Sequence, residues 1–143
     1  MSSAAAPGRV IAIDLGARRI GVAVTDGLGL TAQPLQTVPR RGGKRDLDAI
    51  AALVRTHGAV RIVVGLPLAP DGEPGRAAKS AEAFAARLRE AIGLFVELVD
   101  ESFSTVEAEE VLLAADVSRA RRREVVDKMA AAVILRRWLD AQR

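Results

Sequence analysis

The order of apolar segments along the chain constrains the fold more than any other feature. Val and Ile gather in short runs over 9–15 and 20–25, and a third extended segment covers roughly 30–38. The Asp26-Gly27 pair between the second and third segments is typical of a hairpin turn. Pro34 lacks a backbone N–H, so the third strand is expected at a sheet edge. The first 38 residues therefore predict an antiparallel three-stranded meander.

The rest of the chain alternates between helical and extended patterns. The expected order is a basic, glycine-broken loop at 40–44, a helix at 46–57, a strand at 61–64, a helix at 81–92 and a strand at 95–99. Two successive strand-helix-strand units predict parallel strands joined by right-handed crossovers. A capping box at Ser104 to Glu107 predicts a helix that runs to about 115, and a last helix is expected over 119–139. The fold class is therefore α/β, with a five-stranded mixed sheet flanked by helices.

Length and composition predict one domain. The chain has 143 residues, half of them apolar, which is enough for one core and leaves no room for a second. We expect a disordered tail over 1–8 and a single domain over 9–143. The tail lacks the charged and apolar regions of a signal peptide, and no apolar run is long enough to cross a bilayer. A cytoplasmic protein is expected.

The side chains that are missing limit the kinds of metal site. Cysteine is absent, and His57 is the one histidine. A disulfide framework, a thiolate zinc site and a cluster of imidazoles are therefore excluded. Any bound metal must have oxygen ligands.

Three carboxylates lie at the edges of three separate apolar segments. Asp14 ends the first strand segment, Glu101 follows the segment 95–99, and Asp127 precedes an Ala-rich part of the last helix. A carboxylate beside a buried strand costs free energy unless a charge compensates it, and a hard divalent cation compensates several at once. The three acids therefore predict one metal site.

The expected topology brings these acids together. Ligands gather at the carboxyl ends of strands in an open α/β sheet. If the first strand is central and parallel to the fourth and fifth, Asp14 and Glu101 end neighbouring strands a few ångströms apart, where a cation must offset their repulsion. Ala130 and Ala131 leave the helix face beside Asp127 without bulk, which lets that helix approach the sheet. Alternatively, Asp127 is a solvated helix acid next to Arg121, Arg122 and Arg123.

Three oxygen ligands with open positions suit Mg²⁺ or Mn²⁺ better than a dedicated Ca²⁺ cage. Such ions activate water and neutralise the charge that develops on a transferred phosphoryl group. Hydrolysis of a phosphodiester is the reaction that this site predicts.

Four ordered motifs resemble those of a known family. They are Asp14-x-Gly16-x-x-x-Ile20-Gly21-Val22-Ala23-Val24, Val64-Gly65-Leu66-Pro67-Leu68-x-x-Asp71-Gly72, Asp100-Glu101-x-x-Ser104-Thr105-x-Glu107-Ala108 and Val126-Asp127-x-x-Ala130-Ala131. Together they resemble the YqgF/RuvX family over about 9–139. Four motifs in order over nearly the whole chain are far more specific than any one of them.

The resemblance implies an RNase H-like fold and a nuclease of the Holliday-junction-resolvase type, or one that matures the 5′ end of pre-16S ribosomal RNA. It implies that Asp14, Glu101 and Asp127 are the catalytic and metal-binding acids. The chain departs from the family pattern at two positions. Ser102 stands where members commonly have Arg, and Ala17 stands where they commonly have Thr. The missing guanidinium at Ser102 could be replaced by Arg18, Arg19 or Lys128.

Basic residues are expected to bind the nucleic acid. The formal net charge is +3, and only three of the 21 basic residues are lysines. Arg offers bidentate contacts to phosphates. The candidates for nucleic-acid contact are Arg18, Arg19, Arg76, Lys79, Ser104, Thr105, Arg121, Arg122, Arg123 and Lys128. As an alternative, the run 121–123 is a solvated face.

Aromatic residues are scarce, with three Phe, one Trp and no Tyr, so we expect recognition of structured nucleic acid by shape and charge rather than by stacking on unpaired bases. Phe84, Phe95 and Trp138 are expected in the core. A homodimer is expected if a junction is cut on two strands.

Two other functions remain open. One is a nucleic-acid-binding or ribosome-assembly factor that keeps the nuclease fold with weak catalysis, an alternative that Ser102 leaves open. The other is an actin-like or sugar-kinase-like phosphate binder, because Asp14-x-Gly16 before a hairpin also suits a phosphate loop. Such enzymes close two domains around a nucleotide, and this chain has room for one.

Overall fold

The computed structural model describes residues 8–67, 75–100 and 119–142, with side chains from 125 onward in the last range. The elements in chain order are β1 (Arg9–Leu15), β2 (Arg19–Thr25), β3 (Ala32–Pro39), α1 (Gly43–His57), β4 (Ala59–Leu66), α2 (Arg76–Ile92), β5 (Phe95–Asp100) and α4 (Arg119–Ala141). Within these ranges, no helix is both long and apolar enough to cross a membrane. The helix predicted from Ser104 lies outside the described residues.

The five strands form one mixed sheet in the order β3-β2-β1-β4-β5. β2 pairs antiparallel with β1 and with β3, whereas β4 pairs parallel with β1 and with β5. The predicted meander, the parallel half and the central position of β1 are thereby confirmed. Pro34 lies in the edge strand β3, where the register shifts so that Gln36 pairs with Val22 but Pro34 pairs with Ala23. Such a bulge suits a residue that cannot donate to the ladder.

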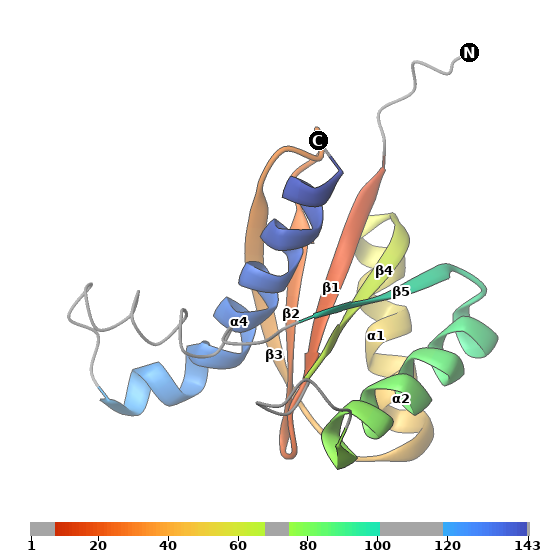
Figure 1. Ribbon diagram of the computed structural model, residues 1–143, viewed down its shortest axis with the longest axis vertical. Coiled ribbons are helices and arrows are strands. Elements are labelled where there is room, and N and C mark those ends of the chain that lie inside the picture. The colour runs from red at the N-terminus through yellow and green to blue at the C-terminus, as the bar shows by residue number, and fades with distance from the viewer. Residues whose placement is uncertain (1–7, 68–74, 101–118, 143) are drawn as a thin grey trace.

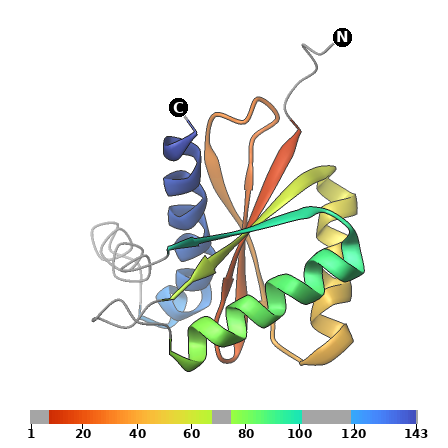
Figure 2. The same ribbon diagram turned by 45° about the vertical axis from the view of Figure 1, so that its right-hand side comes forward.

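Helices cover both faces of the sheet. Among the described helices, α1 and α2 lie on one face and α4 lies on the other (Figure 1; Figure 2). Strand residues alternate between the two faces. Ile11 and Ile13 of β1 belong to the larger buried cluster with α1 and α2, whereas Val10 and Ala12 belong to a second cluster with α4. The carboxyl ends of β1, β4 and β5 all lie at one end of the sheet.

Three sequence expectations need correction. Helix α2 begins at Arg76, five residues before the start of the apolar pattern that predicted it at 81–92. Helix α1 begins at Gly43, before the predicted start at residue 46, because Asp46 accepts hydrogen bonds from the backbone N–H groups of Arg41 and Gly42 and so supports an earlier turn. Phe95 is 61% exposed and is not a core residue. It is the first residue of an edge strand, and its ring packs against the Arg61 guanidinium, 4.7 Å from the ring centroid. Phe84 and Trp138 are buried, as predicted.

The connection between β2 and β3 is held by a side chain. The Asp26 carboxylate accepts hydrogen bonds from the backbone N–H groups of Leu30 and Thr31 at 2.7 and 2.8 Å. The bond from Thr31, with a smaller one from Leu30, lowers the pKa of the Asp26 carboxyl below its ordinary value. The predicted Asp26-Gly27 turn is therefore built around the ionised form of Asp26.

A buried hydroxyl joins β1 to the end of β2. Thr25 is fully buried, and its Oγ1 accepts a hydrogen bond of 2.9 Å from the backbone N–H of Val10. A buried donor that loses its acceptor costs about 1 to 3 kcal/mol. We predict that Thr25→Val, which keeps the shape and removes the acceptor, lowers the free energy of unfolding in urea by about that amount. Thr25→Ser keeps the acceptor and should lose only the burial of one methyl group, about 0.8 kcal/mol. A Thr25→Val protein as stable as the unaltered chain would contradict this role.

Candidate functional site

The carboxylate of Asp14 comes from the end of the central strand. Asp14 is 8% exposed, although it is charged. Val10 and Ala12, four and two positions earlier, face α4, so strand alternation places Asp14 on the same face. Its strand partner in β2 is Gly21. A nearly buried carboxylate therefore lies between the sheet and α4.

Helix α4 touches the sheet backbone directly at Gly21. A Cβ atom built on Gly21 would overlap the carbonyl oxygen of Asp127 and would lie 2.9 Å from the backbone nitrogen of Lys128. Real Cβ atoms essentially never approach backbone so closely, so only glycine fits here. Because Gly21 pairs with Asp14, this contact brings the turn of α4 that carries Asp127 to the strand residue opposite Asp14.

The small residues that follow Asp127 allow α4 to lie this close to the sheet. Ala130 and Ala131, one turn further along α4, are fully buried against the sheet. The predicted close approach of a helix face without bulk is therefore confirmed. The side chain of Asp127 is 20% exposed and forms an ion pair with Arg19, whose Nε lies 2.7 Å from Asp127 Oδ2. It is not the freely solvated helix acid of the alternative interpretation.

Arg19 reaches Asp127 from β2 because of the same alternation. Arg19, Gly21 and Ala23 share a strand face, and Ala23 packs in the cluster with α4. The guanidinium therefore neutralises one oxygen of Asp127 and fixes the orientation of the carboxylate. Arg19 remains 46% exposed, which leaves the rest of its guanidinium open to an anion.

The third predicted acid, Glu101, lies outside the described residues. It follows Asp100, which ends β5 and pairs with Leu66 at the end of β4. One prediction about it was wrong: the strand that leads to Glu101 is not a neighbour of β1, because β4 lies between them. Neighbouring strands are about 4.8 Å apart, so β1 and β5 are separated by about twice that spacing. Each parallel crossover adds its strand next to the preceding one, which explains the order.

The donor set suits a hard divalent cation. Asp14 and Asp127 supply carboxylate oxygens on one face at one end of the sheet, and Arg19 is paired with Asp127. Among the residues that the structure describes, no cluster of three or more acidic, His or Cys side chains could hold a metal. The sequence predicts Glu101 as a further oxygen ligand of this site.

The predicted nucleic-acid contacts are spread around this end of the sheet. Arg18 is exposed in the turn after Asp14, and Arg76 and Lys79 are exposed in the first turn of α2. Lys128 is half-buried beside Gly21. Ser104, Thr105 and the side chains of Arg121, Arg122 and Arg123 lie outside the described residues, as does Ser102.

Sequence reasoning missed the position of Arg40 at the same end of the sheet. Arg40 Nη1 donates a hydrogen bond of 2.8 Å to the carbonyl oxygen of Gly16, and the Arg40 backbone N–H donates one of 2.9 Å to the carbonyl of Arg18. The segment after β3 is therefore tied to the turn that follows Asp14. A basic run around two glycines was the signal in the sequence, but a loop assignment alone says nothing of what lies next to it.

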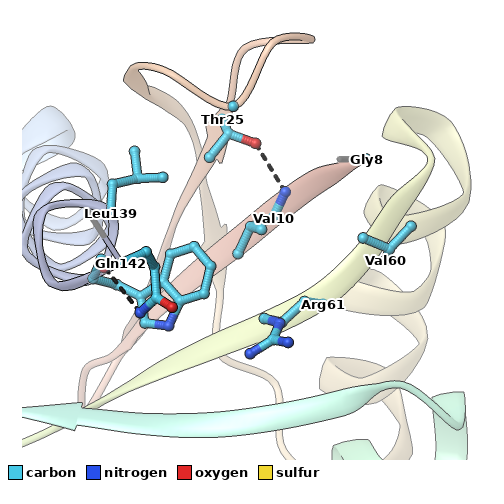
Figure 3. Close-up of a pocket in the computed structure, with 9 residues that line it drawn as sticks. Gly8, Val10, Thr25, Val60, Arg61, Leu139 and Gln142 are labelled. Atoms are coloured by element: carbon cyan, nitrogen blue, oxygen red, sulfur yellow. Dashed lines mark hydrogen bonds between the residues drawn. The ribbon is translucent and has the colours of Figure 1, made fainter. Parts of the chain in front are cut away.

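A pocket occupies the opposite end of the molecule. It has a volume of about 340 Å³ and is lined by residues that include Val10, Thr25, Val60, Arg61, Trp138 and Leu139. Figure 3 shows Val10 at the start of β1, Val60 and Arg61 at the start of β4, and Leu139 in the last turns of α4 around this pocket. The Arg61 guanidinium pairs with Glu97 at 3.1 Å and lies 5.5 Å from the centroid of the Trp138 ring. This pocket is far along the strands from Asp14 and Asp127 and is not part of their site.

A family model described as RuvX, Holliday junction resolvase, matches residues 8–141. The chain belongs to the RuvX family. The resemblance in the four motifs is thereby confirmed. Relatives from Myxococcus xanthus, Symbiobacterium thermophilum and Geobacillus kaustophilus are 53%, 52% and 49% identical over 94% of this chain and cover 89%, 93% and 99% of their own lengths. Their names describe them as candidate pre-16S rRNA nucleases.

Solved resolvase structures share the fold. Thermus thermophilus RuvC bound to a Holliday junction substrate superimposes with a TM-score of 0.57 at 16% identity, over 94% of this chain and 95% of that one. Fowlpox virus resolvase in complex with Holliday junction DNA gives a TM-score of 0.60 at 8% identity, over 94% and 98%. The predicted RNase H-like fold is therefore confirmed for this RuvX-family chain.

The Gly21 contact can be tested by adding one methyl group. Gly21→Ala should push α4 away from β2, because the new Cβ overlaps the Asp127 backbone. We expect a loss of about 1 to 3 kcal/mol in the free energy of unfolding, and a drop of about 100-fold in any cleavage that depends on the position of Asp127. Gly27→Ala is the matched control, since its Cβ would meet only Arg9 Nη2 at 3.8 Å. Equal stability and cleavage in the two variants would show that α4 does not depend on this contact.

Proposed function

We propose that this RuvX-family protein is a divalent-metal-dependent nuclease that hydrolyses phosphodiester bonds in structured nucleic acid. The main support is the backbone contact at Gly21, which brings Asp127 of α4 to the strand residue opposite the nearly buried Asp14. Two carboxylates on one face of a sheet end, with one guanidinium between the elements, form an oxygen-rich anionic site. Family membership supports the same chemistry.

Asp14, Glu101 and Asp127 would hold the metal, and Mg²⁺ or Mn²⁺ is the ion that suits such ligands. When bound, the ion would lower the pKa of a coordinated water and offset charge on the phosphoryl oxygens. Arg19 would keep the Asp127 carboxylate in one orientation through its Nε and present its remaining N–H groups to a phosphate. Its place beside Asp127 makes it the best substitute for the arginine that the family pattern has at Ser102.

The substrates that best fit the proposal are four-way DNA junctions and the 5′ segment of precursor 16S rRNA. Resolvases from Thermus thermophilus and Fowlpox virus, with the same fold, were solved with Holliday junctions, and the bacterial relatives are named as candidate pre-16S rRNA nucleases. Cleavage of a junction on two strands needs two active sites, so a homodimer is part of the proposal. A location in the cytoplasm is a separate part of it.

The first test replaces a charge without changing its shape. Asp14→Asn should abolish cleavage of both substrates while the fold and substrate binding persist, because the amide keeps the volume of the carboxylate and loses its charge. Asp48→Asn, at an exposed position of α1, is the control with the same change of charge. Cleavage should be measured in single-turnover assays beside a binding titration. A folded Asp14→Asn protein that cuts at the unaltered rate would remove Asp14 from the site.

The second test changes the metal. Removing divalent ions with a chelator should stop cleavage, and adding back Mg²⁺ or Mn²⁺ should restore it, whereas Ca²⁺ should restore little because its larger, looser coordination suits this chemistry poorly. Full cleavage in the presence of excess chelator would contradict metal dependence.

A further inference from the structure

The segment Arg40–Arg45, here called the basic loop, joins β3 to the first turn of α1. Four of its six residues are cations, and none is acidic. Arg40 fastens the loop to the catalytic end of the sheet through its bonds to the carbonyls of Gly16 and Arg18. Gly16 lies two residues after Asp14, so Arg40 ties the basic loop to the turn that follows this proposed metal ligand.

A buried carboxylate holds the basic loop in one conformation. Asp46 is 3% exposed, and its Oδ1 and Oδ2 accept hydrogen bonds from the backbone N–H groups of Arg41 and Gly42 at 2.8 and 2.9 Å. Gly42 and Gly43 both have positive φ, which only glycine adopts readily. The loop is therefore a built structure, although its cationic side chains are on the surface.

The cations of the basic loop are poorly placed for the stability of α1. Lys44 and Arg45 lie in the first turn, where the helix dipole is positive and where the one favoured, acidic residue is the buried Asp46. The N-cap residue, Gly42, makes no side-chain capping bond. Arg41, Lys44 and Arg45 are all exposed, so burial does not compensate for their placement. A local rule that is broken without a structural gain is expected at a functional site.

We infer that the basic loop is a docking surface for the phosphate backbone of a substrate arm outside the cleavage site. This inference rests on the proposed nuclease function and deepens it. Arg41, Lys44 and Arg45 add their charges to the positive end of α1, and closely spaced phosphates are the anions that such a cluster fits. The loop has no aromatic residue on which a base could stack, so it contacts the backbone of DNA and RNA without regard to sequence.

The first experiment removes the three exposed charges. The variant Arg41→Gln, Lys44→Gln, Arg45→Gln should bind a four-way DNA junction and an RNA hairpin at least tenfold more weakly in chelator, with a salt dependence lower by about three released ions. The control variant, Arg55→Gln, Arg87→Gln, Arg136→Gln, loses the same charge at exposed positions. Arg55 is ten residues further along α1 than Arg45, about 15 Å away. Equal loss of affinity in the two variants would overturn the inference, since only net charge would then matter.

The thermal stability of the same variant separates binding from structure. Removing cations from the first turn of α1 should raise Tm by about 2 to 4 °C, because the unfavourable dipole interaction is relieved. A lower Tm would assign these cations to the stability of the fold and would overturn the docking role.

A second variant tests the buried anchor against simple electrostatics. Asp46→Asn makes the protein more positive. It also leaves one acceptor oxygen in place of the two carboxylate oxygens that accept hydrogen bonds from Arg41 and Gly42. If the conformation of the basic loop matters, folded Asp46→Asn should bind both probes at least threefold more weakly, and Asp48→Asn, with the same change of charge at an exposed position, should not. Tighter binding by both variants would show that charge alone acts here.

The two proposals can fail separately. An unaltered protein that binds both probes through the basic loop but cuts neither would refute the nuclease function and leave the docking surface intact. An unaltered protein that cuts its substrates, while the basic-loop variant binds them as the control variant does, would refute the docking surface alone.

Discussion

The contact between the backbones of α4 and β2 at Gly21 is the constraint on which the rest of the site depends. Any side chain at that position would overlap the carbonyl of Asp127, so the helix could not lie as it does against the sheet. The register of β1 against β2 then determines which carboxylate is opposite, and that residue is Asp14. Because Gly21 has no Cβ atom, the helix turn that carries Asp127 can lie beside the strand residue opposite Asp14, although the two acids are more than 100 residues apart in the sequence.

Charge near the carboxyl end of β1 is divided between two arrangements. Arg19 is paired with Asp127 and belongs to the interior arrangement of the site, whereas the exposed cations of the basic loop are directed at solvent beside it. The buried carboxylate of Asp46 holds the backbone that presents those cations, and Arg40 ties that backbone to the turn after Asp14. The opposite end of the sheet has a different character, with an apolar pocket beside Trp138 and an Arg61 that is already engaged with Glu97.

Much of the fold followed from local patterns. Period-two and helical spacing predicted the strands and helices in the right order, and Pro34 marked β3 as an edge strand, because these signals come from residues adjacent in the chain. The errors arose where a distant partner decides. The start of α1 depends on the hydrogen bonds that Asp46 accepts from the backbone of Arg41 and Gly42. Phe95 is exposed because its strand lies at the sheet edge, where its ring packs on the Arg61 guanidinium and not in the core.

For the site, the sequence by itself determined the chemical character. The chain has no cysteine and one histidine, so its candidate ligands are carboxylates, which lie at the ends of apolar segments and within motifs of one family. Only the tertiary structure decided which groups meet. The separation of β1 from β5 by β4, the ion pair of Arg19 with Asp127 and the attachment of Arg40 to Gly16 all depend on strand order and register. The sequence lists the charges, but distances between them are set by hydrogen-bonded ladders and packed helices, which join residues regardless of their separation along the chain.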